Sequence, residues 1–431
     1  MITDPTAVAI LLGVMFGLIF FGTPIAIAIG VASVITTTYI GIPLMTVAQN
    51  LVKGINVYAL MAVPFFILAG EIMGTGGISR RLIELSNALV GWLRGGLAMV
   101  NIVASMFFGG ISGSSAADTS SIGSVMIPMM KDAGYDGEFS TAVTMTSSVQ
   151  GILIPPSHNM VLYAMVVGGV SIGELFMGGL VPGVLLGVAL MIYCYIISTI
   201  RNYPIGEKFN LRAALKTTLS ASLGLGTVFI VVGGVISGIF TATESAAIAV
   251  VYSFIVTFFI YREVPLSEFS GMLGRSIKTL SIVMILVGCA SAFGWLIAYL
   301  KIPAFITSKI LAISSNKYVL MLIINVLLLF LGMIMDMASI ILIVTPILYP
   351  IAMQIGLDPV HFGVMMILNL GVGLITPPVG STLFIGSAIA GIKIEKLAKA
   401  MIPFYVVMVI VLLIITYIPE VVLFVPKLMR N

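Results

Sequence analysis

The sequence contains little charge. Only 8% of its 431 residues are charged, whereas a soluble domain has about 25%. Sixteen acids, 20 Lys and Arg and two histidines give a net charge of +4, spread too thinly for the basic face that binds nucleic acid. Hydrophobic residues make up 60% of the chain and occur in long runs. We therefore exclude an ordinary soluble protein and a nucleic-acid-binding protein, and we expect a protein that lies in the lipid bilayer.

Other features are missing as well. The two cysteines, Cys194 and Cys289, lie inside apolar runs, where small core residues are more common than disulfides or metal ligands. The first Lys or Arg is Lys53, so the basic n-region of a secretory signal is absent. The apolar runs lack the polar and apolar alternation of porin strands. The sequence therefore predicts an all-α polytopic membrane protein.

Ten apolar stretches approach the roughly 20 residues that cross a bilayer. They lie at 6–21, 24–40, 58–75, 140–167, 172–198, 221–238, 243–261, 279–299, 360–389 and 400–418. Two further stretches, 97–131 and 318–353, are too long for one perpendicular helix and have small or polar residues at their middle. We predict that each is a re-entrant hairpin, with its tip at Gly109–Ser115 (the first tip) or Gly332–Asp336 (the second tip). One long tilted helix, or a pair of short spans, is the alternative.

The distribution of Lys and Arg predicts the orientation. Fourteen of the 20 lie in five of the loops, which we call the basic loops: 76–96, 131–138, 199–220, 262–278 and 390–399. Cytoplasmic loops of membrane proteins are enriched in these residues. Ten spans place all five loops in the cytoplasm if the first hairpin enters from the cytoplasm, the second hairpin enters from outside, and both termini are outside.

The two halves of the sequence resemble each other. The segment Gly151–Ser157 (the first break) matches the segment Gly373–Val379 at an offset of 222 residues, and both contain Pro-Pro. We call Gly373–Gly380 the second break. Four further pairs follow at this offset or one residue from it: Pro128 and Pro350, Gly134 and Gly356, Asp136 and Asp358, and Gly109 and Gly332. Each half then has five spans and one hairpin. An odd number of spans inverts the second copy, so we predict two inverted-topology repeats.

The two breaks and the two tips are candidate cation sites. Adjacent prolines remove backbone donors and interrupt a helix, and broken backbone at membrane depth survives only inside protein or beside a polar cavity. The carbonyl and hydroxyl groups that become available suit a hard cation such as Na⁺, and the lack of Cys and His clusters argues against zinc or copper. The first predicted site contains Ser112, Gly113, Ser114 and Ser115 with Gly151 and Pro155 of the first break. The second contains Gly332 and Asp336 with Gly373 and Gly380 of the second break.

Two acids in apolar stretches require separate explanations, because a charge at bilayer depth is costly and indicates function. Asp336 is predicted to be a direct cation ligand or a coupled proton carrier. Asp118 either caps the returning half-helix of the first hairpin or contacts the substrate. Glu174 and Glu244 fit the first turns of helices and are predicted to be structural.

Positive charge is absent where an anion would bind. Residues 95–130, 132–200 and 318–392 contain no Lys or Arg. An anionic substrate would therefore depend on co-bound cations and helix N-termini. The predicted hydrogen-bond donors to it are Ser157, Asn159, Ser381 and Thr382, and this arrangement predicts obligatory coupling to a cation.

An enzyme is the alternative from another class. The segment Gly-Ile-Ser-Gly at 110–113 is similar to the nucleophile turn of rhomboid proteases, but only His158 and His361 could act as its base. The second tip has Met-Ile-Met at 333–335 where a matching nucleophile would lie. We therefore predict no catalytic residue. A passive channel is a further alternative, which gradient-driven accumulation of substrate would exclude.

Several motifs in order resemble one family. They are Gly-Gly-Ile-Ser-Gly-Ser-Ser-Ala-Ala-Asp at 109–118, Pro-Pro-Ser at 155–157, Phe-Thr-Ala-Thr-Glu at 240–244, Phe-Gly-Trp at 293–295 and Gly-Leu-Ile-Thr-Pro-Pro-Val-Gly at 373–380. Together they resemble the large membrane subunit of TRAP (tripartite ATP-independent periplasmic) transporters, which belong to the ion transporter superfamily. The likeness extends over essentially the whole chain.

The resemblance implies an elevator-type fold in a bacterial inner membrane. Its scaffold would comprise residues 1–95 and 201–310, and its transport domain residues 96–200 and 311–431. It also implies Na⁺-driven import of an organic acid such as a C4-dicarboxylate or sialic acid, a small four-span membrane subunit, and a periplasmic solute-binding protein. Ser112, Asp336 and Thr376 match cation-site positions of the family. A stand-alone divalent-anion:Na⁺ symporter of the same superfamily is the alternative.

Overall fold

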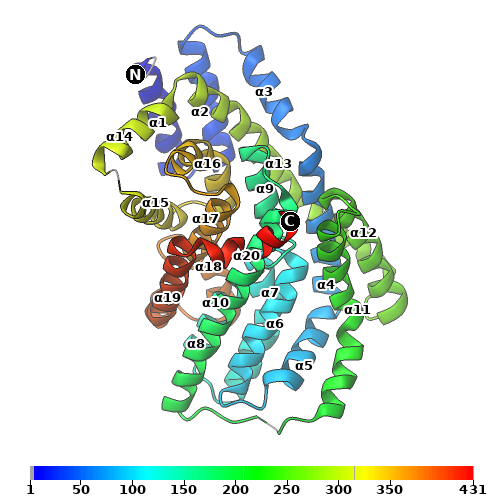
Figure 1. The fold of residues 1–431 in the computed structure, drawn as a ribbon. Helices are drawn as coiled ribbons and strands as arrows, with labels where there is room; N and C mark the ends of the chain where they lie inside the picture. The colour runs from blue at the N-terminus through cyan, green and yellow to red at the C-terminus, as the bar shows by residue number, and fades with distance from the viewer. Residues whose placement is uncertain (1–3, 207, 315, 431) are drawn as a thin grey trace.

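The structure is a computed structural model that describes residues 4–206, 208–314 and 316–430. Within these ranges every regular element is helical, apart from one isolated β-bridge between Arg94 and Ile205. The prediction of an all-helical protein is therefore confirmed. Figure 1 shows the path of the chain and the helix labels used below.

The first half of the chain forms ten α-helices. Residues up to 95 form α1 (Pro5–Phe20), α2 (Ile25–Tyr39), α3 (Met45–Ile55), the 3-10 turn η1 (Tyr58–Met61), α4 (Ala62–Thr75) and α5 (Ile78–Val90). Residues 96–200 form α6 (Gly96–Ser112), α7 (Ser115–Asp132), α8 (Gly137–Ser148), the 3-10 turn η2 (Val149–Ile152), α9 (His158–Val167) and α10 (Ile172–Ile200).

The second half follows a similar order. It begins with α11 (Leu211–Ile236), α12 (Ala242–Ile255), the π-helical turn η3 (Val256–Tyr261), the 3-10 turn η4 (Leu266–Glu268), α13 (Phe269–Tyr299) and α14 (Ile302–Ile313). It ends with α15 (Lys317–Gly332), α16 (Met337–Gln354), α17 (Pro359–Leu374), α18 (Ser381–Ala390), α19 (Ile394–Tyr417) and α20 (Pro419–Arg430).

Seven helical segments among the described residues are long and apolar enough to cross a membrane. Seven shorter apolar helices accompany them: α1, α2, α6, α9, α15, α17 and α18. The sequence analysis left α3, α5, α14 and α20 outside its spans, because these helices are only 11 to 13 residues long. The structure is thus a polytopic membrane protein with additional short helices between its spans.

Each predicted hairpin consists of two helices, so the alternative of one long helix is wrong. In the first hairpin α6 ends at Gly113, which has φ +60°, a conformation that favours glycine at a helix C-terminus. The Ser114 side chain then accepts a hydrogen bond from the Ala117 amide and caps α7. In the second hairpin Asp336 caps α16 after a short turn that follows α15.

Both predicted breaks are present. The first interrupts the predicted span 140–167 between η2 and α9, and the second interrupts the predicted span 360–389 between α17 and α18. The Pro155–Pro156 and Pro377–Pro378 peptide bonds are both cis. The helices therefore stop where the paired prolines remove donors from the helical hydrogen-bond ladder.

The five basic loops lie on one face of the molecule, which we call the basic face. Four contacts join them in pairs: Arg81 Nη2 to Glu263 Oε1 at 2.6 Å, Arg201 Nη1 to Asp136 Oδ2 at 2.5 Å, the bridge between Arg94 and Ile205, and the close approach of Ile392 to Gly137. The chain from α10 to α11 runs along this face at the bottom of Figure 1. This placement of all five loops on one face agrees with the number of spans predicted between them.

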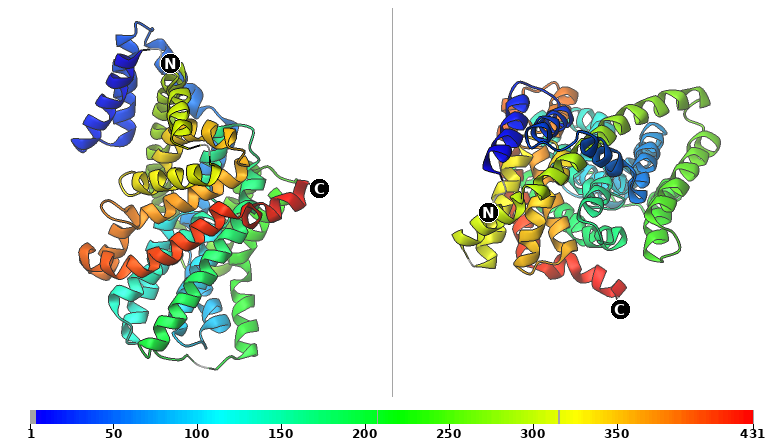
Figure 2. Two further views of the ribbon diagram at one scale, coloured as in Figure 1. Left: turned by 60° about the vertical axis from the view of Figure 1, so that its left-hand side comes forward. Right: turned by 90° about the horizontal axis from the view of Figure 1, so that it is seen from above.

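Large apolar side chains cover much of the outer surface. On α11, which pairs with α12 at the outer edge of the molecule in Figure 2, Leu215, Leu219 and Phe229 are all exposed. Figure 2 also shows the α1–α2 pair at one edge of the molecule, where α2 packs against α13. Such surfaces suit contact with lipid or another membrane protein rather than water.

Candidate functional site

The first tip packs directly on the first break. A Cβ added to Gly151 would lie 2.9 Å from Gly109 Cα, closer than real side chains approach. A Cβ on Gly113 would lie 3.2 Å from Ser157 Cα and would also overlap the Pro156 carbonyl. Only glycine therefore permits this approach, which brings the backbone of the tip against the backbone of the break.

The second tip packs on the second break in the same way. A Cβ on Gly373 would lie 2.6 Å from Gly332 Cα. The Val379 amide donates a hydrogen bond of 3.0 Å to the Met333 carbonyl, which joins the break to the tip. The tip and break segments from which each predicted cation site was drawn are thus in direct contact, one tip with one break in each half.

Three hydroxyl groups meet beside the first tip. Ser115 Oγ lies 2.7 Å from Ser148 Oγ and 3.4 Å from Thr382 Oγ1, and all three residues are buried. Thr382 belongs to α18 in the other half of the chain, so this cluster links the two halves. The sequence analysis proposed Thr382 as a donor to the substrate, but the structure shows its hydroxyl in contact with Ser115.

Other oxygen atoms of the first site are buried with no hydrogen-bond partner among the described residues. They include Ser157 Oγ and Gln150 Oε1. Ser112 Oγ accepts only a long hydrogen bond, of 3.4 Å, from the Ser114 amide. A buried oxygen without a donor is costly unless it interacts with something else. These oxygen atoms fit a hard cation such as Na⁺, because such cations prefer oxygen ligands.

Asp118 lies in the first turn of α7 and is fully buried. Ser114 is the N-cap of α7, so the alternative that Asp118 caps this helix is wrong. The Ser105 hydroxyl lies beside the Asp118 carboxylate, but neither oxygen of this carboxylate has a well-formed hydrogen bond to a described residue. The structure therefore places Asp118 behind the first tip and not on the surface of a cavity.

The second site is more open than the first. Asp336 and Ser381 are exposed on the surface of the chain, whereas the first break is almost entirely buried. The Asp336 carboxylate accepts a hydrogen bond of 3.0 Å from the Ala338 amide. The Thr376 hydroxyl donates to the Val372 carbonyl at 2.6 Å. Asp336 thus has a capping role that the sequence analysis missed, and its role as a cation ligand stays a prediction.

A cavity of 520 Å³ lies beside the first tip, between α4, α7 and α13. Its polar lining includes Ser112, Ser114, Ser121, His158 and Thr279. It reaches the C-terminal end of α4, which leads into the first of the basic loops, so it lies toward the basic face. Asn159, the fourth predicted donor to the substrate, is buried in the first turn of α9.

One acid lines this cavity. Glu71 Oε1 lies 2.5 Å from Arg275 Nε, and a second carboxylate, that of Glu268, lies 3.5 Å from Arg275 Nη1. The ion pair neutralises Glu71 and brings a base from α13 to the side of the cavity. The base-free stretches of the sequence do not extend to α13, and the sequence analysis therefore missed this group.

Three other buried asparagines were not among the residues singled out from the sequence. Asn101 on α6 donates to Thr144 Oγ1 at 2.7 Å, and Asn325 on α15 donates to Thr416 Oγ1 at 3.1 Å. Asn369 on α17 donates to Asn325 Oδ1 at 2.8 Å. The sequence did contain a signal for these asparagines, because an amide in the middle of an apolar stretch requires a hydrogen-bond partner inside the protein. These hydrogen bonds fix the first helix of each hairpin to its neighbours.

The fold resembles that of solved transporters. One of them is the YdaH transporter of Alcanivorax borkumensis, with a TM-score of 0.61 and 14% sequence identity, over 86% of each chain. At this identity the likeness shows the fold alone, which here is all-helical with paired hairpins and broken helices.

The family follows from the sequence comparison. The model of the tripartite ATP-independent periplasmic transporter, DctM component, matches residues 12–421. The chain belongs to this family of large permease subunits. The resemblance inferred from the motifs is confirmed, and the chain is a transporter permease and not an enzyme.

Three curated relatives align with most of this chain. The C4-dicarboxylate TRAP transporter large permease protein DctM of Pseudomonas aeruginosa is 41% identical over 86% of each chain. The sialic acid TRAP transporter large permease protein SiaM of Vibrio cholerae is 39% identical over 96% of each chain. The isethionate TRAP transporter permease protein DctMQ of Oleidesulfovibrio alaskensis is 41% identical over 96% of this chain and 66% of its own length. Permeases of this family work with a small membrane subunit and a periplasmic binding protein.

We predict that alanine at Gly109 destabilises the protein. Its Cβ would overlap the Gly151 backbone, which cannot move aside as a flexible side chain could. Overpacking of this kind costs about 1–3 kcal/mol. In Gly13→Ala the added Cβ meets nothing within 4 Å, so this matched control should gain up to about 1 kcal/mol from helix propensity.

Thermal unfolding in detergent micelles measures both effects. The unfolding midpoint should fall for Gly109→Ala and hold or rise for Gly13→Ala. Equal midpoints for the two variants would show that the tip does not depend on close approach to the break.

Proposed function

We propose that this chain is the permease subunit of a Na⁺-coupled secondary transporter that imports an organic acid. The observation that supports the proposal most is the packing of each hairpin tip on one break, together with the polar cavity beside the first tip. The relatives' names refer to a C4-dicarboxylate, sialic acid and isethionate, all of which are organic acids. In the proposed system a periplasmic binding protein delivers the substrate, and a small four-span subunit accompanies this chain.

Two Na⁺ sites would hold the coupling ions. The first would use Ser112, Gly113, Ser114 and Ser115 with Gly151 and Pro155, and its support is the buried Ser157 hydroxyl, which has no hydrogen-bond partner among the described residues. The second would use Gly332, Asp336, Gly373, Thr376 and Gly380. Bound Na⁺ would offset the charge of the acid, because the transport helices themselves lack Lys and Arg near the breaks.

The proposed movement is that of an elevator. Residues 96–200 and 311–431 would form the transport domain, and the Ser115–Thr382 contact and the hydrogen bond of 2.8 Å from the Tyr163 hydroxyl to the Pro359 carbonyl join its two halves. The scaffold would contain α4 and α13. The 520 Å³ cavity lies between these scaffold helices and the first tip, so a displacement of one domain against the other would open or close it.

We further propose that the basic face lies in the cytoplasm and that both termini are periplasmic, in the bacterial inner membrane. The basis is the excess of Lys and Arg on that face. The cavity beside the first tip would then face the cytoplasm. This conformation would be the one that releases substrate.

We predict that uptake requires Na⁺ and the two candidate ligands. Asp336→Asn keeps a capping oxygen but removes the charge, and Ser112→Ala removes one oxygen from the first site. Each should lower uptake by about tenfold or more, since interactions with a charged group contribute about 1.5–3 kcal/mol. The assay is accumulation of labelled substrate in proteoliposomes that contain both membrane subunits, with the binding protein outside. The control is Ser124→Ala, because the Ser124 hydroxyl contacts only the Ser121 carbonyl of its own helix.

Undiminished uptake without Na⁺, or wild-type uptake in both site variants, would contradict the proposed coupling. Full uptake with no binding protein present would instead favour the stand-alone symporter.

A second prediction concerns orientation. Alkaline phosphatase fused after Asn431 should be active in cells, because it would fold in the periplasm. The same enzyme inserted in the loop between α10 and α11 should be inactive. The reverse pattern of activities would contradict the proposed orientation.

A further inference from the structure

A second cavity, of 390 Å³, lies on the opposite side of the molecule from the basic face. Its lining comes from α3, the end of α9, the C-terminal part of α13, and α16. The α13 helix begins beside the basic loop 262–278 and continues for 31 residues, which corresponds to about 46 Å. Trp295, near its far end, lines the cavity. The cavity is therefore separated from the basic face by most of the length of α13.

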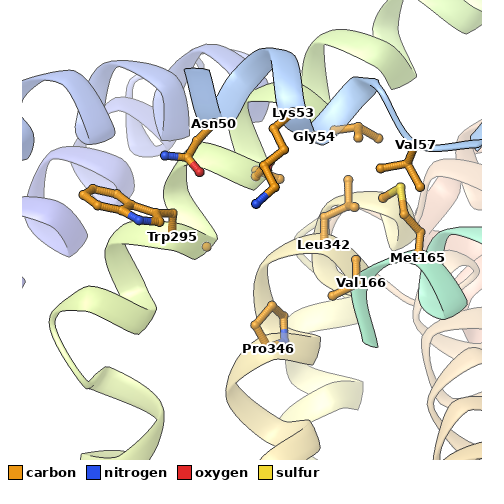
Figure 3. A pocket seen from close by; sticks show the side chains of 13 residues that line it. Asn50, Lys53, Gly54, Val57, Met165, Val166, Trp295, Leu342 and Pro346 are labelled. Atoms are coloured by element: carbon orange, nitrogen blue, oxygen red, sulfur yellow. The ribbon is translucent and has the colours of Figure 1, made fainter. Parts of the chain in front are cut away.

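The helices around this cavity belong to both proposed domains. Lys53 on α3 and Trp295 on α13 are in the proposed scaffold, whereas Met165 on α9 and Leu342 and Pro346 on α16 are in the proposed transport domain. Figure 3 shows these side chains around one space. The cavity therefore exists only while the two proposed domains keep their present positions relative to each other.

Lys53 is the one charged residue in the lining of this cavity. It makes no ion pair with another described residue. In Figure 3 its ammonium group points into the space between Trp295 and Leu342. Its backbone is held there by Gly54, where an added Cβ would overlap Ser291 of α13. Lys53 also lies in the last turn of α3, where a base is favourable, but that role does not require the side chain to enter a cavity.

The other lining groups suit the rest of an organic anion. Asn50 uses one amide hydrogen for the Thr46 carbonyl at 2.8 Å, and its other polar atoms are free to bind a ligand. The indole nitrogen of Trp295 is a further donor. Val57, Met165 and Leu342 provide apolar contact for a short carbon chain. The volume lies at the small end of the range for ligand sites, about 300–1,000 Å³.

We propose that this cavity binds a small organic anion with a carboxylate or sulfonate group, and that Lys53 supplies the opposing charge. The inference rests on the proposed function, since it places the site on the side from which substrate would arrive. An anion that leaves this side meets no Lys or Arg in residues 132–200 or 318–392. Lys53 therefore attracts the anion to the boundary between the domains. A displacement of the transport helices separates the residues that line the site, and the anion is released.

Trp295 makes the test direct, because the chain contains only two tryptophans. In a Trp92→Phe background, Trp295 is the sole indole reporter and lines the cavity. The purified chain is titrated with sodium succinate in lipid nanodiscs, with sorbitol as a neutral control and a constant Na⁺ concentration. We expect a saturable change in Trp295 emission with succinate and none with sorbitol.

Charge variants then identify the binding group. Lys53→Gln should weaken succinate binding by about tenfold or more, whereas Lys53→Arg should retain it. Lys309→Gln, on the exposed side of α14 and outside this cavity, is the matched control and should bind as the parent does. Retained binding by Lys53→Arg also excludes misfolding as the cause of a loss.

An unchanged succinate response in Lys53→Gln would overturn the proposal, as would a change in emission with phosphatidylglycerol in the nanodisc but none with succinate. The titration separates this inference from the proposed function. Na⁺-dependent uptake with no response of Trp295 would reject the anion site alone, and a Lys53-dependent response together with Na⁺-independent uptake would reject the coupling alone.

Discussion

The close approach of glycine backbone to glycine backbone at the two tips is the constraint on which the rest of the structure depends. Gly109 meets Gly151, and Gly332 meets Gly373, with no room for a side chain between them. Because the prolines of each break remove helical hydrogen bonds at membrane depth, the backbone there must be shielded by protein. Each hairpin tip provides that shield, and the same contact brings carbonyl and hydroxyl groups from two elements to one place.

Lys and Arg residues are absent from the tips and breaks themselves. The basic loops meet on one face through ion pairs such as Arg81–Glu263, while the segments 132–200 and 318–392, which contain the breaks, have hydroxyls and amides but no Lys or Arg. Bases do reach the domain boundary from the proposed scaffold: Arg275 beside the first tip and Lys53 near the opposite side. In the proposed mechanism an anion meets a scaffold base at each side, and it crosses with the cations that the tips and breaks hold.

Much of the fold could be predicted from the sequence, because its signals are local. Paired prolines located both breaks, a run of glycine and serine located the first tip, and Gly332 with Asp336 in the middle of a long apolar stretch located the second. The pairing of Ser115 with Ser148 and Thr382 could not be predicted, since it joins residues that are distant along the chain. The capping alternative for Asp118 was wrong because Ser114, four residues earlier, already satisfies the start of α7. Lys53 was noted only as the first base of the chain, because a single base in a short helix does not indicate a binding site until α13 and α16 are placed beside it.

The central claim is that the tips and breaks move together, as one domain, against the helices that contain Arg275 and Lys53. Double electron–electron resonance tests it most directly, with spin labels at Lys278 and Ser124 across the proposed domain boundary, and at Ser124 and Lys396 within the transport domain. Cys194 and Cys289 are replaced by serine in both samples. The account predicts that Na⁺, substrate and the partner proteins shift the Lys278–Ser124 distance and leave the Ser124–Lys396 distance unchanged. A constant distance across the boundary during active transport, or a change within the transport domain instead, would contradict it.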